Sequence, residues 1–375
     1  MKPKIIAMYL PQFHEIEENN LFWGKGYTDW VAVKNAIPLF DGHQQPRIPF
    51  AHNYYDLSKK ESIRRQANLA RNNGVYGFGI YHYWFSSEKQ VLTKPAEIIL
   101  QNKDIDINYC FAWDNGSWKR SWDNIPGNDW APLYDKKTEK IDGNSKGKFL
   151  LEYKLGGKET WEKHFYDLLP YFQDNRYIQL DKKPLFIIWS YSSDLEPMIE
   201  YWNLLAVKEG FSGISIMFQD IPVRNIPKKY PRLLYQPSAA SWGRIPYRIK
   251  NKLFKMFHIS SGLKVFNYEK IWKNLIQQAR GIKDPNLYYG AFVGYDDTPR
   301  RGSIGTIVQD QSPETFYSYM KKIFYISEQK NKEYIFLTAW NEWAEGAYLE
   351  PDVLMKDAYL CALKAAYEDY QHEKK

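Results

Sequence analysis

The stretch Glu-Tyr-Ile-Phe-Leu-Thr-Ala-Trp-Asn-Glu-Trp-Ala-Glu-Gly, residues 333–346, joins an almost continuous apolar run to a cluster of polar and aromatic residues. A short run that is apolar at consecutive positions is typical of a strand covered on both faces, as in a parallel sheet. We therefore interpret 333–339 as a buried strand, and the residues from 340 onward as the loop that follows its carboxyl end.

Similar runs occur eight times, at 4–10, 77–83, 107–113, 184–189, 213–218, 232–236, 288–294 and 333–339. Most are separated by stretches with helical spacing of apolar residues, and the helical segments that we expect are 56–73, 160–172, 195–208, 268–280, 312–331 and 352–370. This alternation predicts an α/β protein with a parallel sheet, and eight strands favour a (β/α)₈ TIM barrel. The alternative is an open doubly wound sheet. It would be favoured by a glycine-rich first turn, whereas the first strand runs into Pro-Gln-Phe-His at 11–14.

The length of 375 residues suits one barrel with insertions. Two connections are long, 114–157 after the third strand and 238–266 after the sixth, and both would lie over the carboxyl ends of the strands. Without an internal repeat or a low-complexity segment, we expect one domain, residues 1–375.

Composition limits the function. The chain holds 14 Trp, 30 Tyr and 20 Phe, many of them beside turn-forming residues, and aromatic faces stack on the C–H faces of sugars. The net charge of +7 is modest, and the basic residues are not clustered as in a nucleic-acid binder, so we expect no nucleic-acid partner.

The opening run 5–10 is too short for a signal peptide, and no stretch approaches the length of about 18 apolar residues that a membrane helix needs. We therefore expect a cytoplasmic protein.

Polar and aromatic residues crowd the ends of the predicted strands and not their beginnings. Catalytic residues of barrels come from the carboxyl ends of several strands, so we expect a carbohydrate substrate to bind there. The candidates for substrate binding are Gln12, His14, His82, Trp84, Trp113, Asp114, Gln236, Tyr295, Asp296, Asn341 and Trp343.

The cluster after the last predicted strand gives the most specific indication of a chemical reaction. Glu342 and Glu345 are three residues apart just past a strand, a spacing that lets both project toward one site if the chain turns helically. Glycosidic cleavage commonly uses two such carboxyl groups, one to protonate the leaving oxygen and the other as nucleophile or base. The alternative is that Glu-x-x-Glu merely begins a solvated helix.

Several other chemistries lack their motifs. The sequence has no phosphate-binding or dinucleotide-binding glycine loop, no nucleophile elbow and no His or Cys spacing typical of a metal site. We therefore expect no metal and no cofactor. Asp104-Ile105-Asp106 resembles the Asp-x-Asp of nucleotide-sugar transferases, but it precedes the third strand and would lie at the wrong end of the barrel.

The basic stretch 244–255 is either a solvated face or a peripheral contact with a glycolipid.

Six motifs resemble the WbsX-type family of bacterial O-antigen and capsule polysaccharide genes, whose members were named glycosyltransferases. They are Tyr-Leu-Pro-Gln-Phe-His (9–14), Trp-Gly-Lys-Gly-Tyr-Thr-Asp-Trp (23–30), Tyr-His-Tyr-Trp-Phe (81–85), Phe-Ala-Trp-Asp-Asn (111–115), Asp-Asp-Thr-Pro-Arg-Arg (296–301) and Ala-Trp-Asn-Glu-Trp-Ala-Glu-Gly-Ala-Tyr-Leu-Glu-Pro-Asp (339–352). The resemblance covers nearly the whole chain, and the last motif is the most specific.

That family is in turn similar to the endo-α-1,2-mannosidases of glycoside hydrolase family 99, which are (β/α)₈ barrels. Their Asn-Glu-Trp-x-Glu-Gly motif maps onto Asn341, Glu342, Trp343, Glu345 and Gly346. The resemblance implies that Glu342 deprotonates the sugar 2-hydroxyl to give a 1,2-anhydro intermediate. It also implies that Glu345 acts as acid and then as base, with net retention.

Three functions follow as hypotheses. The leading one is a retaining, endo-acting glycoside hydrolase on a bacterial polysaccharide or glycan. The second is a glycosyltransferase of O-antigen or capsule assembly, with a transglycosylase between the two. The third is a non-catalytic sugar-binding module, which would bind glycans regardless of Glu342 and Glu345.

Overall fold

A computed structural model describes residues 2–121, 128–135, 149–219, 225–244, 247, 249 and 262–373. Eight parallel strands form a closed barrel, because β1 pairs with both β12 and β2, the two ends of the strand order β1-β12-β10-β8-β7-β6-β4-β2. The strands are β1 (Lys4–Tyr9), β2 (Val75–Ser86), β4 (Asn108–Trp113), β6 (Lys183–Ile188), β7 (Ser215–Phe218), β8 (Arg232–Leu234), β10 (Leu287–Phe292) and β12 (Tyr334–Thr338). The predicted (β/α)₈ barrel is confirmed, and each predicted strand overlaps one of these eight.

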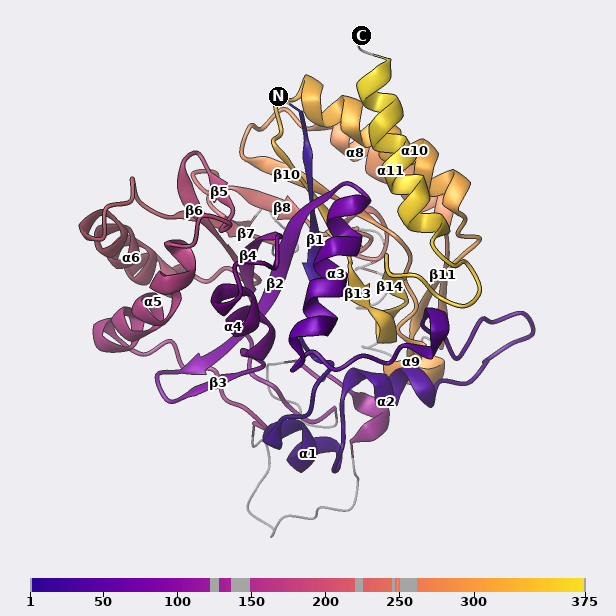
Figure 1. The fold of residues 1–375 in the computed structure, drawn as a ribbon, viewed down its shortest axis with the longest axis horizontal. Coiled ribbons are helices and arrows are strands. Elements are labelled where there is room, and N and C mark those ends of the chain that lie inside the picture. The colour runs from indigo at the N-terminus through magenta and orange to yellow at the C-terminus, as the bar shows by residue number, and fades with distance from the viewer. Residues whose placement is uncertain are drawn as a thin grey trace.

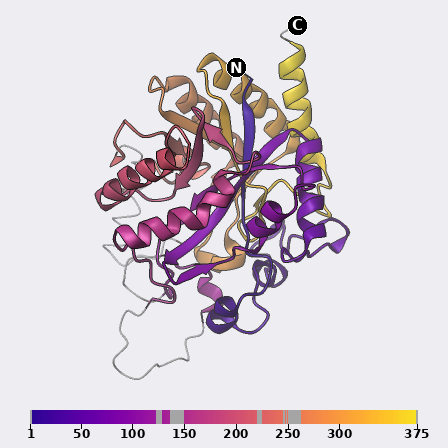
Figure 2. The same cartoon turned by 60° about the vertical axis from the view of Figure 1, so that its left-hand side comes forward.

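Helices surround the barrel (Figures 1 and 2). The longer ones are α3 (Lys60–Asn72), α4 (Lys94–Gln101), α5 (Lys158–Phe172), α6 (Glu196–Lys208), α8 (Tyr268–Gly281), α10 (Pro313–Gln329) and α11 (Ala358–His372). The described residues between β7 and β8 contain no α-helix. Both chain ends lie at the amino-terminal end of the barrel, with α10 and α11 beside them (Figure 1).

Smaller elements gather at the carboxyl ends of the strands. The connection from β1 to α3 carries α1 (Glu17–Trp23), α2 (Asp29–Lys34) and a 3₁₀ turn, η1 (Phe50–His52). The connection after β10 carries α9 (Thr298–Arg301), η6 (Gly302–Ile304) and β11 (Thr306–Gln309), which pairs in parallel with β9 (Lys264–Asn267). The same end of the barrel carries the hairpin of β2 with β3 (Lys89–Val91), the turn η2 (Pro132–Tyr134) and the turn η3 (Ser193–Leu195). The short strand β5 (Gln179–Leu180) lies at the other end, where it pairs antiparallel with the beginning of β6.

The barrel strands are buried almost throughout, as the apolar runs predicted. All residues of β7 and β12 are buried, and so are all but the first residue of β1, β4, β6 and β10. Helices meet this core with one face each: α3 buries Ile63, Ala67 and Ala70, three and four positions apart.

Local signals fix where two of the outer helices begin. The Ser312 hydroxyl accepts a hydrogen bond from the Thr315 backbone N–H, and Pro313 occupies the first turn of α10. The Asn267 side chain caps α8 in the same way through the Lys270 N–H. Such caps satisfy backbone donors that a helix end would otherwise leave unpaired.

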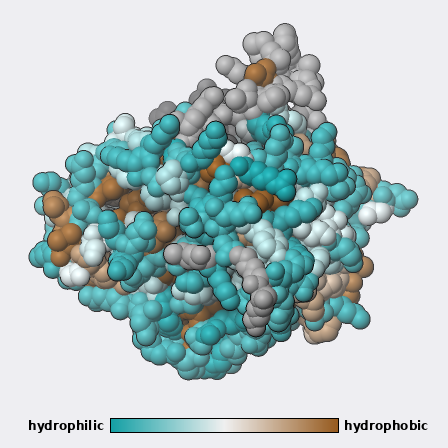
Figure 3. Space-filling model, turned by 90° about the horizontal axis from the view of Figure 1, so that it is seen from above, coloured by the Kyte–Doolittle hydropathy of each residue, from teal (hydrophilic) through white to brown (hydrophobic). Residues whose placement is uncertain are grey.

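The surface in Figure 3 is mostly hydrophilic, with hydrophobic patches scattered among polar residues. Among the described helices, none combines the length and the apolar character required to span a bilayer.

Gly77 marks a close approach of two barrel strands. A Cβ at this position of β2 would lie 2.5 Å from the backbone oxygen of Asn108 on β4. We expect Gly77→Ala to lower the free energy of unfolding by about 1–3 kcal/mol, because the two strands must separate to admit the methyl group. Urea unfolding followed by circular dichroism measures this difference. Gly281→Ala is the matched control, since nothing lies within 4 Å of its Cβ position, and equal losses in both variants would contradict the steric explanation.

Candidate active site

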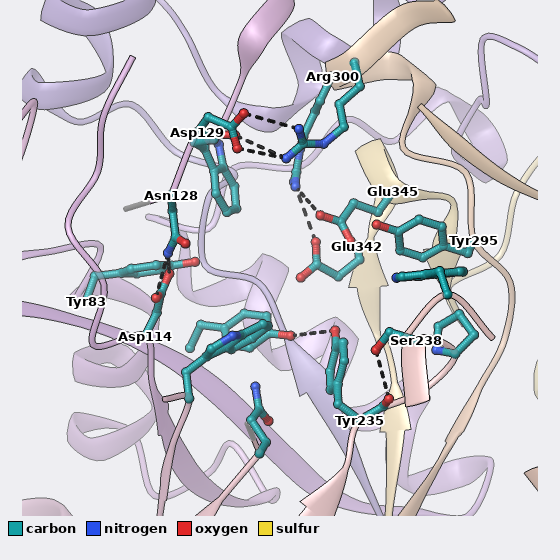
Figure 4. A pocket seen from close by; sticks show the side chains of 17 residues that line it. Tyr83, Asp114, Asn128, Asp129, Tyr235, Ser238, Tyr295, Arg300, Glu342 and Glu345 are labelled. Carbon is teal, nitrogen blue, oxygen red and sulfur yellow. Dashed lines mark hydrogen bonds and ion pairs between the residues drawn. The ribbon is translucent and has the colours of Figure 1, made fainter. Parts of the chain in front are cut away.

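A cavity of about 380 Å³ opens at the carboxyl ends of the barrel strands (Figure 4). Its walls come from the residues that end or follow β2, β4, β6, β7, β8, β10 and β12. The lining residues are Tyr81, Tyr83, Asp114, Asn128, Asp129, Trp130, Trp189, Gln219, Tyr235, Pro237, Ser238, Trp242, Tyr295, Arg300, Arg301, Glu342 and Glu345.

A compact turn after β12 brings both glutamates to this cavity. β13 (Asn341–Glu342) pairs antiparallel with β14 (Ala347–Tyr348), and the 3₁₀ turn η7 (Trp343–Glu345) lies between them. Gly346 ends the turn with φ 56°, a left-handed conformation that glycine adopts without strain. The turn is tied to β1 because the Leu10 N–H donates to the Asn341 Oδ1 at 2.7 Å, and the Asn341 Nδ2 donates back to the Leu10 carbonyl.

Arg300, from α9, lies between the two glutamates. Its Nη1 donates to the Glu345 Oε1 at 2.8 Å, and its Nη2 lies 3.6 Å from the Glu342 Oε2. Figure 4 shows the guanidinium above both carboxylates. One cation is therefore shared by two acidic side chains that face the same cavity.

The guanidinium is held from behind by Asp29, at the beginning of α2. The Nε and Nη2 of Arg300 donate to the Asp29 Oδ1 at 3.1 and 2.8 Å, and both residues are buried. The guanidinium also lies over the Trp130 ring, 4.1 Å from its centroid, where a cation is attracted by the ring. Asp29 and Trp130 thus fix the position of the Arg300 guanidinium beside the two glutamates.

The two glutamates differ in environment. Glu342 is only 5% exposed, and burial, followed by the charge of Glu345, raises its pKa well above the ordinary value, although Arg300 opposes this. Its Oε2 has no hydrogen-bond partner among the described residues. The Glu345 side chain is 25% exposed. The pair therefore consists of one buried carboxyl group with a raised pKa and one that is in contact with solvent.

Aromatic rings form much of the cavity wall. The hydroxyls of Tyr81 and Tyr235 lie 3.3 Å apart, and Trp189 contacts both rings at centroid distances of 5.7 and 5.3 Å. Trp242 packs against Tyr295 at 4.8 Å. Such surfaces suit the apolar faces of pyranose rings.

Another carboxyl group, Asp114, lines the cavity just after β4. The Asn128 Nδ2 donates to its Oδ1 at 2.9 Å and to its Oδ2 at 3.1 Å. Burial raises the pKa of Asp114 to about 6, despite hydrogen bonds from Asn128 and the Gly116 N–H that favour the charged form. Asp114 thus titrates above the range of an ordinary aspartate.

The structure brings four of the predicted site residues together in the cavity, namely Asp114, Tyr295, Glu342 and Glu345. On β2, successive side chains point to opposite sides of the strand, so Tyr81 and Tyr83 line the cavity while His82 and Trp84 face outward. The His82 Nε2 lies 2.9 Å from the His164 Nε2 of α5, and Trp84 stacks on the same His164 ring at 4.0 Å.

Other predicted residues are buried around the cavity and do not line it. Trp113 donates from its Nε1 to the Trp84 carbonyl, in the layer between barrel and helix. Gln12 accepts from the Asn19 Nδ2, and Gln236 accepts from the Ala240 N–H of the turn η5 (Ser238–Ala240). His14 is buried, which lowers its pKa. These side chains shape the connections that surround the site.

Three further predicted residues, Asn341, Trp343 and Asp296, do not line the cavity but help to hold the turn in place. Asn341 bonds the Leu10 backbone, and Trp343 stacks on Tyr348 at 3.8 Å. Asp296 accepts from the His43 Nε2 at 2.9 Å and from the Gln45 Nε2 at 2.7 Å. Burial by itself would raise the pKa of Asp296, but the hydrogen bond from His43 and the charge of Arg47 bring it down to about 2.

Sequence reasoning missed Arg300 and Asp29, although both stand within motifs that carry the family resemblance. It also missed Tyr81, Tyr83, Trp189, Gln219 and Tyr235, which line the cavity. The period of two along β2 could have indicated the tyrosines once either face was known. Within the described parts of the chain, no group of three or more His, Cys, Asp or Glu is arranged to hold a metal ion. Of the basic stretch, Arg248, Lys250, Lys252 and Lys255 lie outside the described residues.

The closed barrel and its carboxylate-lined, aromatic cavity define a carbohydrate-active enzyme of the (β/α)₈ class. The family described as Glycosyltransferase WbsX matches residues 5–363, and the chain belongs to this family. It is 29% identical over 376 residues to the uncharacterised protein WxcX of Xanthomonas campestris pv. campestris, in strain B100 and in strain ATCC 33913. The match covers 96% of this chain and 49% of WxcX, so the chain spans about half the length of these relatives.

Solved structures share the fold. The GH99 endo-alpha-mannosidase from Bacteroides thetaiotaomicron in complex with bis-tris propane is 15% identical, with 99% of this chain and 98% of that chain covered and a TM-score of 0.53. A glycoside hydrolase-like protein is 13% identical, with 98% and 94% covered and a TM-score of 0.54. At these identities the likeness shows a common barrel architecture.

The raised pKa of Asp114 has a consequence for stability. The folded state holds the proton more tightly than the unfolded chain, whose aspartate has its ordinary pKa near 3.8, so stability falls as the pH rises from about 4 to 6. We expect Asp114→Asn to remove part of this fall, on the order of 1 kcal/mol, when urea unfolding is compared at pH 4.5 and 7.5. The surface variant Asp167→Asn serves as control. Identical pH dependence in wild type and Asp114→Asn would contradict the prediction.

Proposed function

We propose that the chain is a retaining, endo-acting glycoside hydrolase of a bacterial polysaccharide or glycan, with Glu342 as base and Glu345 as acid and base. The observation that carries the proposal is the pair itself: both carboxyl groups face one cavity and share the guanidinium of Arg300. The buried Glu342 Oε2 without a partner is free to accept a hydroxyl proton, and Glu345 is reached by solvent.

The first step moves two protons. Glu342 takes the proton of the sugar 2-hydroxyl while O2 forms a bond to C1. The bond from C1 to the leaving oxygen breaks, and Glu345 protonates that oxygen. A base with a raised pKa binds the transferred proton more strongly, which suits Glu342 for a weakly acidic hydroxyl.

The second step reverses the proton flow. Glu345, now ionised, takes a proton from the acceptor, whose oxygen attacks C1. The bond from C1 to O2 breaks, and O2 recovers its proton from Glu342. Two displacements at C1 give net retention. Water as acceptor completes hydrolysis, and a sugar hydroxyl completes glycosyl transfer.

Glycosyl transfer is the second candidate, because the chain belongs to a family that bears a glycosyltransferase name. Asp104 and Asp106 do not line the cavity and precede β4, at the opposite end of the strand from the glutamates. The transfer hypothesis therefore rests on the same two carboxyl groups, and the nature of the acceptor separates it from hydrolysis.

We expect Glu342→Gln and Glu345→Gln each to lower the rate of glycan cleavage by about 10³-fold or more, because each removes a group that carries a proton. The assay is release of reducing ends from a panel of bacterial polysaccharides and α-mannans. Glu368→Gln, an exposed residue of α11, is the control and should retain full activity. Full activity in both site variants would overturn the proposal.

Cleavage in H₂¹⁸O distinguishes the two acceptors. Hydrolysis should place one ¹⁸O atom at each new reducing end, because water attacks C1 in the second step. Mass spectrometry of the products measures the label. Products that are joined to an added oligosaccharide and carry no ¹⁸O would identify transfer and exclude hydrolysis as the main reaction.

A further inference from the structure

Among the described residues that line the cavity, only Gln219 has a side-chain amide whose oxygen and nitrogen both lack a hydrogen-bond partner. It follows β7, and its backbone N–H donates to the Ile188 carbonyl at the end of β6. The residue is only 2% exposed, and neither its Oε1 nor its Nε2 has a hydrogen-bond partner among the described residues. A buried amide left in this state costs free energy, and native proteins rarely retain one without a reason.

Another buried glutamine shows the usual arrangement. Gln66 of α3 is 1% exposed, accepts from the Tyr9 hydroxyl at 2.7 Å and donates to the Glu350 Oε1 at 2.8 Å. Both ends of its amide are satisfied inside the protein. The comparison indicates that the partners of Gln219 come from elsewhere, and the cavity beside it is where they can enter.

The neighbours of Gln219 favour a sugar ring. Trp189 follows the adjacent strand β6, lines the same cavity and packs against Tyr81 and Tyr235. An aromatic face next to a donor and an acceptor matches a pyranose, whose C–H face is apolar and whose edge carries polar groups. In the strand order, β8 and β10 lie between β7 and β12. Gln219, which follows β7, therefore lies at a different point on the rim of the barrel from Glu342, which follows β12.

We propose that Gln219 is a specificity-determining residue that forms hydrogen bonds with one donor group and one acceptor group of the substrate sugar. Its Oε1 accepts from a sugar O–H or N–H, and its Nε2 donates to a sugar oxygen. Two neighbouring hydroxyls supply this pair, and so does an acetamido group. The inference rests on the proposed function only in taking the cavity as the sugar site, since Gln219 handles no proton of the reaction.

The test compares Gln219→Met with Gln66→Met, a matched change at a buried glutamine. Gln219→Met removes unpaired polar atoms, so we expect its thermal unfolding midpoint to rise, whereas Gln66→Met loses two hydrogen bonds and should unfold at a lower temperature. A fall for Gln219→Met like that of Gln66→Met would show that the amide has protein partners and would overturn the proposal.

Binding supplies the second readout. Glucose, mannose, galactose, N-acetylglucosamine and N-acetylgalactosamine are titrated at up to 100 mM into ¹⁵N-labelled protein. The side-chain amide signal of Gln219 is assigned by its loss in Gln219→Met. We expect at least one sugar to shift this signal and to bind Gln219→Met about 10- to 100-fold more weakly. A preference for the N-acetyl sugars identifies an acetamido group, and a preference for the others identifies a hydroxyl pair.

Two results of this titration contradict the proposal: no sugar shifts the Gln219 signal, or the variant binds as tightly as wild type. Failure of the proposed function looks different. If Glu342→Gln and Glu345→Gln cleave glycans normally while Gln219→Met loses sugar binding, the catalytic assignment falls and the recognition role stands.

Discussion

The structure of the site depends on one buried cation, the guanidinium of Arg300, surrounded by the carboxyl groups of Asp29, Glu342 and Glu345. One positive charge faces three acidic groups, so it cannot offset the charge of all three at once. Burial is the largest cause of the raised pKa of both Asp29 and Glu342, and for Glu342 the charge of Glu345 adds to it. The buried Glu342 and the partly exposed Glu345 therefore meet Arg300 in different environments before any substrate binds.

These charges come from distant parts of the chain. Asp29 stands at the beginning of α2, Arg300 at the end of α9, and the glutamates follow β12. They meet because β1 lies beside β12 in the closed barrel and Asn341 is bonded to the Leu10 backbone where β1 ends. Closure of the barrel is thus the condition for bringing these charges together.

The sequence predicted the barrel well because each strand is buried on both faces, and this produces a local, continuous apolar run. It predicted the glutamate pair because both members stand in one short motif. The sequence did not predict Arg300 or Gln219 as site residues, because their roles depend on contacts between segments far apart in the chain. His82 and Trp84 were chosen over Tyr81 and Tyr83 because a strand buried on both faces gives no sign of which face is the inside.

Hydrolysis and transfer differ little in what the barrel must provide. In the mechanism that we propose, Glu342 exchanges a proton with the 2-hydroxyl in both reactions, and Glu345 exchanges one with the leaving and then the arriving oxygen. The glutamates and Arg300 would therefore serve either reaction unchanged. The difference lies in whether water or a sugar occupies the space next to Glu345. The same cavity is lined by Tyr295, Trp242 and Arg301, from the connections after β8 and β10. We therefore expect changes in these connections to alter the acceptor while the turn after β12 stays the same.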